Sequence, residues 1–489
     1  MPMGNFVVEE VVSLGDIIVR LQSLDLKNIK NVSFGRIEMP CAHNKELCFQ
    51  RSEILGLYGQ NGSGKTAAVD ALYFLQNIMI GKSLKEEMGD YIDANEDQAE
   101  IWAEFAVFME DSVFEVGYRI QIRRTENRQV EILRELLSCA KNSKGRRTSR
   151  AVFMDYKRDD RSVVFRPKKR LEEVFETNKE YKTDLIVARK LAEKSRCSYI
   201  FGESSREIFF SEHGNAFSEY SAIIKALFHY ALTDLFVIRN SHSGVISANF
   251  VLPMAFRIDK EDPYNPGLKG DFTISLMEAT VLDERQKDVL YQITGQINTV
   301  IHTIIPGMRL DIRDHGFQMM GNGKTGFKVE LLSKRDGIPP IPIRMESEGI
   351  IKIISILNAL IQAFGNASIC LVIDELDAGI FEYMLGELLD IFHKSARGQL
   401  IFTSHNLRAL EMLKKDSIMF STANPNNRYI HMRNMKASDN LRDAYLRSIT
   451  LGGQIEEIYS ETDSFKIARA FRKAGRSMKH TGGEMKHGK

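Results

Sequence analysis

Eight consecutive residues have the types and the spacing of a phosphate-binding loop. Residues 59–66, Gly-Gln-Asn-Gly-Ser-Gly-Lys-Thr, match the pattern Gly-x-x-x-x-Gly-Lys-Ser/Thr. The glycines let successive backbone N–H groups point at phosphate oxygens, because no side chain stands in the way. In this pattern the lysine reaches the β- and γ-phosphates of a nucleoside triphosphate, and the threonine hydroxyl binds Mg²⁺. The predicted binding residues are Gly59, Asn61, Gly62, Ser63, Gly64, Lys65 and Thr66.

The flanking segments predict the elements that position this loop. Residues 53–58, Glu-Ile-Leu-Gly-Leu-Tyr, form a short apolar run that suits a buried parallel strand. Residues 67–72 are mostly good helix formers, so a helix follows the loop and adds the positive end of its dipole. The alternative is a glycine-rich turn before an ordinary helix, and the complete motif with both flanks argues against it.

A near copy of the motif occurs at residues 321–325, Gly-Asn-Gly-Lys-Thr. Its first glycine position is occupied by Gln318, and Gly326 stands where a helix would begin. Residues 327–332 then alternate with the period of a strand, and Asn-Gly is a turn signal. This stretch predicts a hairpin turn and no phosphate site.

A second group of chemically active residues follows another apolar run. Residues 368–373 predict a buried strand that places Asp374 and Glu375 at its carboxyl end, where ligands bind in open α/β sheets. Asp374 can hold Mg²⁺ there, directly or through water, and Glu375 can accept a proton from an attacking water. Together with the phosphate loop, the acidic pair predicts a site that hydrolyses a nucleotide.

A third predicted strand, residues 399–403, is followed by Ser404-His405-Asn406. A histidine after a strand is commonly a satisfied polar residue. Here His405 is expected at the same sheet edge as Asp374, so we favour a contact with the γ-phosphate.

Length and composition describe a globular chain of several lobes. A chain of 489 residues exceeds what one hydrophobic core usually serves, so two or three lobes are expected. The net charge of +1 argues neither for nor against nucleic acid, so any DNA-binding surface must be local. No apolar run approaches the roughly 18 residues of a membrane span, and the N-terminus lacks a signal-peptide pattern. We therefore expect a cytoplasmic protein without a membrane partner.

The cysteines favour a reducing compartment. There are five, an odd number without a Cys-x-x-Cys pair, which fits the cytoplasm better than a disulfide framework. Cys41, His43 and Cys48 resemble part of a zinc site, but no fourth ligand is evident, so chance proximity is the favoured explanation.

The remaining sequence alternates between strand and helix patterns. Strand patterns occur at residues 17–21, 24–32, 34–37, 99–108, 113–122, 130–133, 308–312 and 327–332. Helical periodicity occurs at residues 171–235, 274–304, 350–364, 441–446 and 465–471. Residues 259–270 are rich in Pro and Gly and predict a loop. Residues 141–170 are basic, with Tyr156 and Phe165 interleaved, and predict either a solvated loop, the favoured interpretation, or a contact with a phosphate backbone.

These motifs resemble those of the ABC-type ATPases, specifically the SMC-like branch that includes the OLD (overcoming lysogenization defect) family. The shared order is phosphate loop, long insertion, signature, Leu-Val-Ile-Asp-Glu at 371–375 and Thr-Ser-His at 403–405. The likeness covers the ATPase halves, residues 20–80 and 340–425, and is loose in the insertion. The resemblance implies ATP and Mg²⁺, with Thr66 and Asp374 on the metal and Glu375 and His405 as catalytic residues.

The family's signature opens a helix that binds the γ-phosphate held by the opposite subunit. The matching positions are Ser347, Glu348 and Gly349, and a serine at a helix start offers an N-cap hydroxyl beside the helix dipole. The stretch departs from Leu-Ser-Gly-Gly-Gln, since Glu348 replaces a glycine and Ile350 a glutamine, and a plain capped core helix is the alternative. Asp377 matches the family's D-loop position at the dimer seam. The candidates for the family's glutamine loop are Gln76, Gln121 and Gln129, among which the sequence does not decide.

The resemblance implies an α/β P-loop ATPase head of the ABC type with an antiparallel β subdomain and an inserted helical lobe. The predicted N-terminal ATPase half covers residues 1–140, and the basic, helical lobe covers 141–306. The C-terminal half, with the signature, the acidic pair and His405, covers 307–435. Two helices and a basic tail follow at 436–489.

The same resemblance orders the candidate functions. About 300 residues separate the two motif regions, whereas a transporter ATPase keeps both motifs within one compact domain. A chromosome-organising ATPase would insert a long coiled coil, and the sequence has no sustained heptads that would form one. About 60 residues after Tyr429 are too few for an appended nuclease domain. The leading expectation is a stand-alone, nucleotide-gated ATPase, at least a homodimer, in anti-phage defence with a separate effector such as a nuclease. A DNA-binding repair ATPase of the recombination-mediator type is the alternative, and Glu375 argues against a third, a scaffold with negligible turnover.

Overall fold

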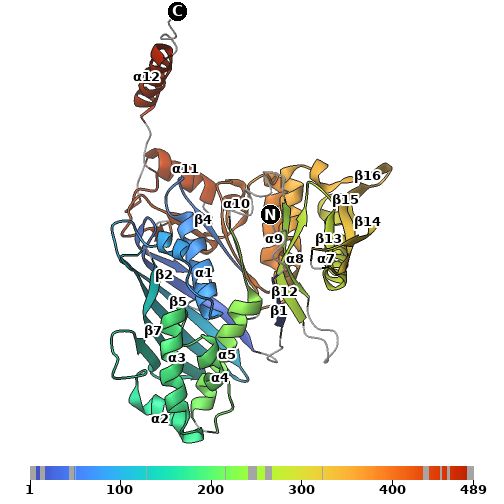
Figure 1. Ribbon diagram of the computed structural model, residues 1–489. Coiled ribbons are helices and arrows are strands. Elements are labelled where there is room, and N and C mark those ends of the chain that lie inside the picture. The colour runs from blue at the N-terminus through green and yellow to red at the C-terminus, as the bar shows by residue number, and fades with distance from the viewer. Residues whose placement is uncertain are drawn as a thin grey trace, which may run out of the picture.

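The computed structural model describes residues 7–11, 17–42, 49, 51–127, 129–214, 216–239, 251–258, 267–321, 323–432, 440–451, 454–459 and 463–481. Figure 1 shows a mixed α/β protein, as the sequence predicts. A mostly parallel sheet lies beside helix α1, an antiparallel sheet with helices α2–α5 lies on one side, and a helix with a long β-ribbon lies on the other.

Both motif regions belong to one sheet. The described strands of this sheet lie in the order β10-β17-β18-β4-β19-β20, all parallel except β20. Their bounds are β4 Glu53–Tyr58, β10 Leu235–Ile238, β17 Cys370–Ile373, β18 Gln399–Thr403, β19 Ile418–Ser421 and β20 Tyr429–Ile430. Parallel strands end at a common edge, so the residues that follow β4, β17 and β18 meet there.

The two faces of this sheet pack against different cores, which explains why its strands are apolar runs without alternation. On one face, Leu55, Leu57 and Ile401 pack with α1 (Lys65–Met79) and the antiparallel sheet. On the other, Ile54 and Phe402 pack with residues of α8 and α9. The helices near this face are α8 Glu348–Gly365, α9 Glu382–Ser395 and α10 Arg408–Met412, with 3-10 turns at Ile343–Met345 and Lys415–Ser417.

The antiparallel sheet has the strand order β3-β2-β5-β6-β7-β8, with β9 also paired to β7. Its strands are β2 Ile18–Ile29, β3 Val32–Glu38, β5 Gln98–Met109, β6 Ser112–Arg124, β7 Val130–Ser143, β8 Arg146–Arg147 and β9 Ala151–Lys157. The predicted break between residues 21 and 24 is wrong, because one strand continues through a register shift between Leu21 and Ser23. The predicted hairpin of β5 and β6 is confirmed.

The helices against this sheet confirm the helical pattern after residue 170. They are α2 Lys168–Thr177, α3 Tyr181–Ser195, α4 Glu203–Phe209 and α5 Phe217–His229, with short turns at Glu86–Tyr91 and Tyr230–Asp234. The lobe expected at 141–306 is not a single unit. Its strand β9 pairs with β7 of the antiparallel sheet, and its strand β10 belongs to the mostly parallel sheet.

The basic stretch 141–170 is largely structural where the chain is described. Arg147, Arg150 and Arg158 form ion pairs with Glu115, Glu104 and Glu131, respectively. Tyr156 and Phe165 are only 2% and 1% exposed, so their rings fill the core and cannot stack on bases. The geometry favours packing and ion pairing over a phosphate-backbone contact here.

The remaining strands and α7 form a third region, where two predictions are wrong. Residues 267–270 begin a strand where a loop is predicted, and the helix expected from residue 274 starts at Glu284, after Asp283 forms a capping box with Gln286. The elements are β1 Val7–Val11, β11 Val251–Ile258, β12 Gly267–Ser275, β13 Thr280–Leu282, α7 Glu284–Ile304, β14 Arg309–Met319, β15 Thr325–Arg335 and β16 Ile338–Pro342. The hairpin predicted around residues 321–325 is confirmed, since β14 and β15 pair antiparallel on either side of it.

Two helices follow the last strand, as the periodicity predicts: α11 Leu441–Leu451 and α12 Ser464–Thr481. Of the described helices, α8 alone has the length and hydropathy of a membrane span, and 67% of that window is buried inside the protein, as in a core helix. His43 and Cys48 of the weighed zinc site lie outside the described residues.

Candidate active site

The phosphate motif forms the turn between β4 and α1 that its flanks predict. Gly59, Gly62 and Gly64 have φ angles of 150°, 79° and 92°, a region that side-chain-bearing residues rarely adopt. A Cβ on Gly62 would meet nothing within 4 Å, so the backbone conformation, and not crowding, requires glycine there. Asn61, Gly62 and Thr66 are exposed, whereas Ser63 and Lys65 are buried. The tip of the loop is therefore exposed to solvent, whereas the side chains of Ser63 and Lys65 are buried.

Side chains from distant segments hold this loop. The Ser63 hydroxyl donates to the Gln60 carbonyl at 2.6 Å and also bonds Ser421, the last residue of β19, which neighbours β4. The Tyr429 hydroxyl donates to the Gly64 carbonyl at 2.6 Å, and Asn31 donates to the Gly62 carbonyl. The loop conformation is thus set by β19, β20 and the β2–β3 turn as well as by its own glycines.

Lys65 is the cation of the site. Its side chain is 7% exposed, and Nζ donates to the carbonyls of Gly59 at 2.7 Å and Gln60 at 3.1 Å. Burial lowers the pKa of Lys65, while the nearby carboxylates of Asp374, Glu375 and Asp377 act to raise it. The tertiary structure therefore brings the lysine of one motif within electrostatic range of the acidic residues of the other.

Asp374 fits a Mg²⁺ ligand. It is 2% exposed, and its Oδ1 accepts hydrogen bonds from Thr403 Oγ1 at 2.6 Å and Thr66 Oγ1 at 3.4 Å. Its Oδ2 is buried and has no hydrogen-bond partner in the described chain. A buried carboxylate oxygen without a partner is unfavourable unless a cation or donor satisfies it. Asp374 and Thr66 carry the hard oxygen atoms that Mg²⁺ prefers as ligands, so these two residues fit the ion and could hold it.

Glu375 has a constrained backbone. Its φ is 50°, a left-handed conformation uncommon for a residue with a side chain. Its N–H donates to Thr403 Oγ1 at 2.7 Å, and its carbonyl accepts from the Lys352 ammonium and from the Ala378 N–H at 3.0 Å. These bonds on both sides of the residue hold its backbone in this conformation and offset the strain.

His405 and Asp377 meet at the same edge. The backbone N–H of His405 donates to Asp377 Oδ2 at 3.0 Å. Desolvation by burial and the charge of Lys65 lower the pKa of His405. The carboxylates of Asp377, Glu375 and Asp374 act in the opposite direction. Taken as a whole, the residue is exposed to solvent. A neutral imidazole that still reaches solvent is suited to donate one hydrogen bond to a phosphate oxygen.

The predicted signature residues meet the loop that follows Glu375. The Ser347 hydroxyl accepts from the Ile350 N–H at 3.4 Å, which confirms the predicted N-cap of α8. A Cβ on Gly349 would lie 1.9 Å from the Gly379 carbonyl oxygen, so only glycine permits this backbone approach. Within one chain, Ser347 and Gly349 are therefore linked to the acidic edge through residues 375–379, while Ser347 remains exposed.

Sequence reasoning gave no role to Thr403, Lys352 or Arg239. Thr403 bonds both Asp374 and Glu375. Lys352 lies in α8 and is 5% exposed. Its position as a single lysine among four isoleucines, Ile-Ile-Lys-Ile-Ile, is the sequence feature that could have predicted a buried, functional lysine. Arg239 follows β10 and lies at the same edge as Asp374, because Ile238 pairs in register with Ile373. The Nη1 atom of Arg239 lies 3.8 Å from Asp70 Oδ1.

The structure places none of the three glutamine-loop candidates at the sheet edge that carries Asp374 and Glu375. Gln76 donates to the carbonyls of Ala231 and Leu235, at the opposite, amino end of β10. Gln121 lies in β6 and donates to Glu100. Gln129 accepts from the Thr125 N–H in the turn between β6 and β7.

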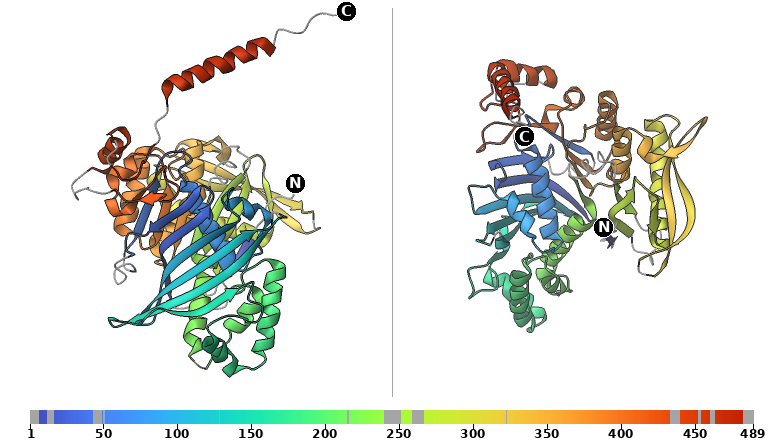
Figure 2. Two further views of the ribbon diagram at one scale, coloured as in Figure 1. Left: turned by 90° about the vertical axis from the view of Figure 1, so that its left-hand side faces the viewer. Right: turned by 45° about the horizontal axis from the view of Figure 1, so that its top comes forward.

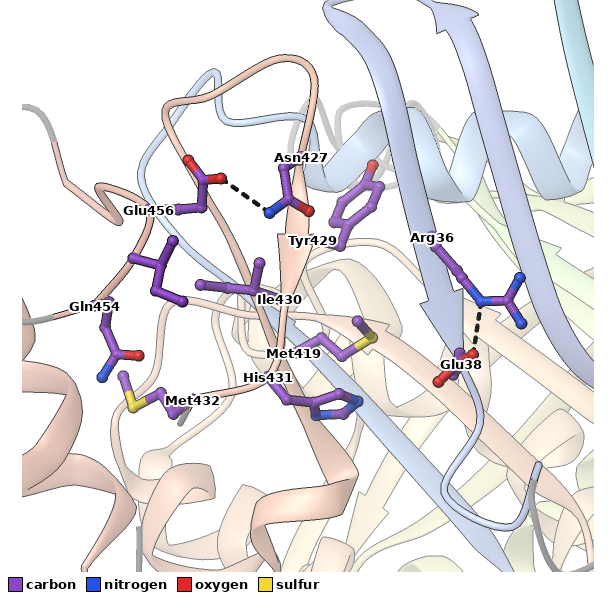
Figure 3. A pocket seen from close by; sticks show the side chains of 11 residues that line it. Arg36, Glu38, Met419, Asn427, Tyr429, Ile430, His431, Met432, Gln454 and Glu456 are labelled. Carbon is purple, nitrogen blue, oxygen red and sulfur yellow. Dashed lines mark hydrogen bonds and ion pairs between the residues drawn. The ribbon is translucent and has the colours of Figure 1, made fainter. Parts of the chain in front are cut away.

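A pocket of about 360 Å³ is lined by Arg36, Asn427 and Tyr429, among other residues (Figure 3). Arg36 pairs with Glu38 there, and Asn427 with Glu456, so these polar side chains already have partners. The pocket is separate from the acidic edge.

No protein-family model matches the sequence, and no curated protein matches it. Among solved structures, it is similar to an Smc head bound to the C-winged helix domain of ScpA, with 14% identity over 84% of this chain and 98% of that chain and a TM-score of 0.40. An Smc head with an extended coiled coil from Pyrococcus furiosus matches at 13% identity over 88% and 98%, with a TM-score of 0.38. The recombination mediator RecF with ATP matches at 12% over 79% and 94%, with a TM-score of 0.33. Likenesses this distant assign neither a family nor an activity.

Proposed function

We propose that this chain is an ABC-type ATPase that hydrolyses ATP to ADP and phosphate with Mg²⁺. The observation that carries the proposal is the convergence of Lys65, Asp374 and Glu375 at one sheet edge, although the first lies about 300 residues from the others. A cation, a buried metal-binding carboxylate and a general base are the groups that phosphoryl transfer to water requires.

Each residue has a defined role in this reaction. The backbone N–H groups of residues 59–64 and the Lys65 ammonium bind the β- and γ-phosphates. Glu375 accepts a proton from the water that attacks the γ-phosphorus, while the bond to the β-phosphate oxygen breaks and ADP leaves. His405 donates to a γ-phosphate oxygen. Mg²⁺ held by Thr66 and Asp374 would neutralise charge on the β- and γ-phosphate oxygens.

Lys352 acts as a positioning residue in this proposal, because its ammonium donates to the Glu375 backbone carbonyl. Lys352→Met keeps the length of the side chain and removes the donor, so we expect kcat to fall about tenfold with KM for ATP unchanged. The thermal midpoint should be unchanged or higher, since an apolar group replaces a buried charge. Lys352→Arg should restore part of the rate, and a Met variant that keeps the parent kcat would remove this role.

The active unit is proposed to be a dimer with sites shared between subunits. One subunit supplies Lys65, Asp374 and Glu375, and the partner's Ser347 and Gly349 complete the γ-phosphate site. Exposed apolar side chains near these residues support an interface there: Met345, Phe381 and Tyr383 are 68%, 66% and 54% exposed. Binding of the γ-phosphate would favour closure, and hydrolysis would release it.

Complementation tests the shared site. Ser347→Arg should permit ATP binding and block closure, because the long side chain occupies the place of the partner's phosphate, and Lys65→Ala should not bind ATP. Each variant is inactive alone, but a mixed dimer contains one site with both halves intact, so ATPase activity should return on mixing.

Ser347→Ala is the matched control, because it removes the N-cap without adding bulk and costs about 0.5–2 kcal/mol of stability. It also removes a hydroxyl proposed to contact the partner's phosphate, so activity should fall, but ATP binding and closure of the dimer should persist, unlike in Ser347→Arg. Mixed dimers that form without activity would show that the site is built within one chain or needs both nucleotides, and a fully active monomer at all concentrations would reject the dimer.

For the biological setting we propose anti-phage defence with a separate effector, such as a nuclease, and DNA repair by a DNA-binding ATPase as the alternative. The chemistry of the site is the same in both settings. The neighbouring genes distinguish them, because a nuclease gene beside this one favours defence.

A further inference from the structure

Helix α12, residues Ser464–Thr481, is the most strongly amphipathic helix of the described chain, and the proposed ATPase does not use it. Its sequence contains no Asp or Glu. Its basic residues are Lys466, Arg469, Arg472, Lys473, Arg476 and Lys479.

The basic and apolar residues of α12 segregate to opposite faces. Ile467, Phe471 and Ala474 recur at intervals of four and three, which places them on one stripe of an α-helix. The basic positions Lys466, Arg469, Arg472 and Lys473, by the same period of 3.6 residues, fall on the opposite side. Phe465 is six residues, about one and two-thirds turns, before Phe471, and therefore falls among the basic positions.

This helix stands clear of the rest of the described chain in Figure 1 and in the left view of Figure 2. Ile467 is 44% exposed and Phe471 is 76% exposed, so the apolar stripe is not buried against the protein. A basic helix with a large exposed phenylalanine on its apolar side is unfavourable in water and requires an external surface.

The charge pattern selects among three kinds of surface. A nucleic acid would use the basic face and leave the apolar stripe in water. An apolar groove of a protein would use the stripe and leave the opposite, basic face without a partner. An anionic lipid surface uses both, because the stripe enters the acyl boundary while Lys and Arg contact headgroup phosphates.

We propose that α12 binds an anionic lipid membrane, lying in the interface with Ile467 and Phe471 on the buried side. This revises the expectation that the chain has no membrane partner. That expectation considered only spans, whereas a helix that lies in the interface needs no run of about 18 apolar residues. The contact does not depend on ATP, so its success or failure is separate from that of the proposed ATPase.

Vesicle sedimentation of the full chain tests the proposal. We expect binding to phosphatidylcholine vesicles that contain phosphatidylglycerol, little binding to phosphatidylcholine alone, and weaker binding as salt is raised. Phe471→Ser should reduce affinity roughly tenfold or more, because it removes a buried aromatic side chain. Phe465→Ser is the matched control: Phe465 is 73% exposed, nearly as much as Phe471, but lies on the basic side, so binding should be unchanged.

Charge and insertion can be measured separately. Arg469→Gln combined with Lys473→Gln should weaken binding to anionic vesicles roughly thirtyfold, at about 1 kcal/mol per charge. The chain has one tryptophan, so Phe471→Trp adds a second whose emission should shift to the blue with anionic vesicles, while Phe465→Trp should not shift. ATPase activity should be the same in all these variants.

Three results would overturn the proposal. One is equal loss of vesicle binding with Phe465→Ser and Phe471→Ser. Another is binding of duplex DNA that the double charge variant abolishes and Phe471→Ser leaves intact, without vesicle binding. The third is that the protein does not bind vesicles and that Phe471→Ser changes its oligomeric state. That result would assign the apolar stripe to a contact with a second copy of the chain.

Discussion

Lys65→Ala is expected to abolish ATP binding. The Lys65 ammonium is the side-chain cation of the phosphate loop, and it lies in a buried position where charge-assisted hydrogen bonds are strong. Loss of its bonds to the β- and γ-phosphates, each about 1.5–3 kcal/mol, should weaken binding by at least about 10²-fold. Calorimetric titration with ATP and Mg²⁺ measures the change.

The fold should survive this change, because the Lys65 bonds found within the described residues go to carbonyls of its own loop. The matched control is Lys85→Ala, since the Lys85 side chain is 74% exposed and lies outside the loop, and it should bind ATP like the parent. If Lys65→Ala retains the parent affinity while its thermal midpoint is also unchanged, the phosphate-loop assignment is wrong.

Glu375→Gln should separate binding from chemistry. Glutamine is nearly isosteric with glutamate but cannot accept the proton of the attacking water, so hydrolysis should drop by roughly 10²–10⁴ while ATP still binds. The constraints at this position act on the backbone, through Thr403 and Lys352, and the substitution leaves them intact. Phosphate release in single-turnover experiments, together with ATP titration, measures the two properties.

Two neighbouring changes make this result specific. Asp374→Asn should also lose dependence on Mg²⁺, because it alters the buried carboxylate whose Oδ2 has no protein partner in the described chain. Glu387→Gln, a change at an exposed acidic residue of α9, should hydrolyse ATP like the parent. Equal turnover in the parent and Glu375→Gln would remove Glu375 from the role of base.

Local sequence predicted those parts of the fold that short-range physics controls. The strand, loop and helix around residues 53–79, the β5–β6 hairpin and the N-cap at Ser347 all follow from periodicity, glycine or capping within a few residues. Element boundaries were less predictable. The start of α7 depends on a capping box at Asp283, and the single strand β2 depends on a bulge matched by its partner β5.

Motifs with local spacing predict the residues that we propose for the chemistry, namely Lys65, Thr66, Asp374, Glu375 and His405. Their arrangement at one sheet edge depends on the tertiary structure. The order of parallel strands brings their ends to one edge, and the bonds of Thr403 and Lys352 to Glu375 join segments whose separation in sequence carries no pattern. Such contacts depend on the packing of sheet and helices as a whole, because a hydrogen bond across the core leaves no periodic signal in the chain.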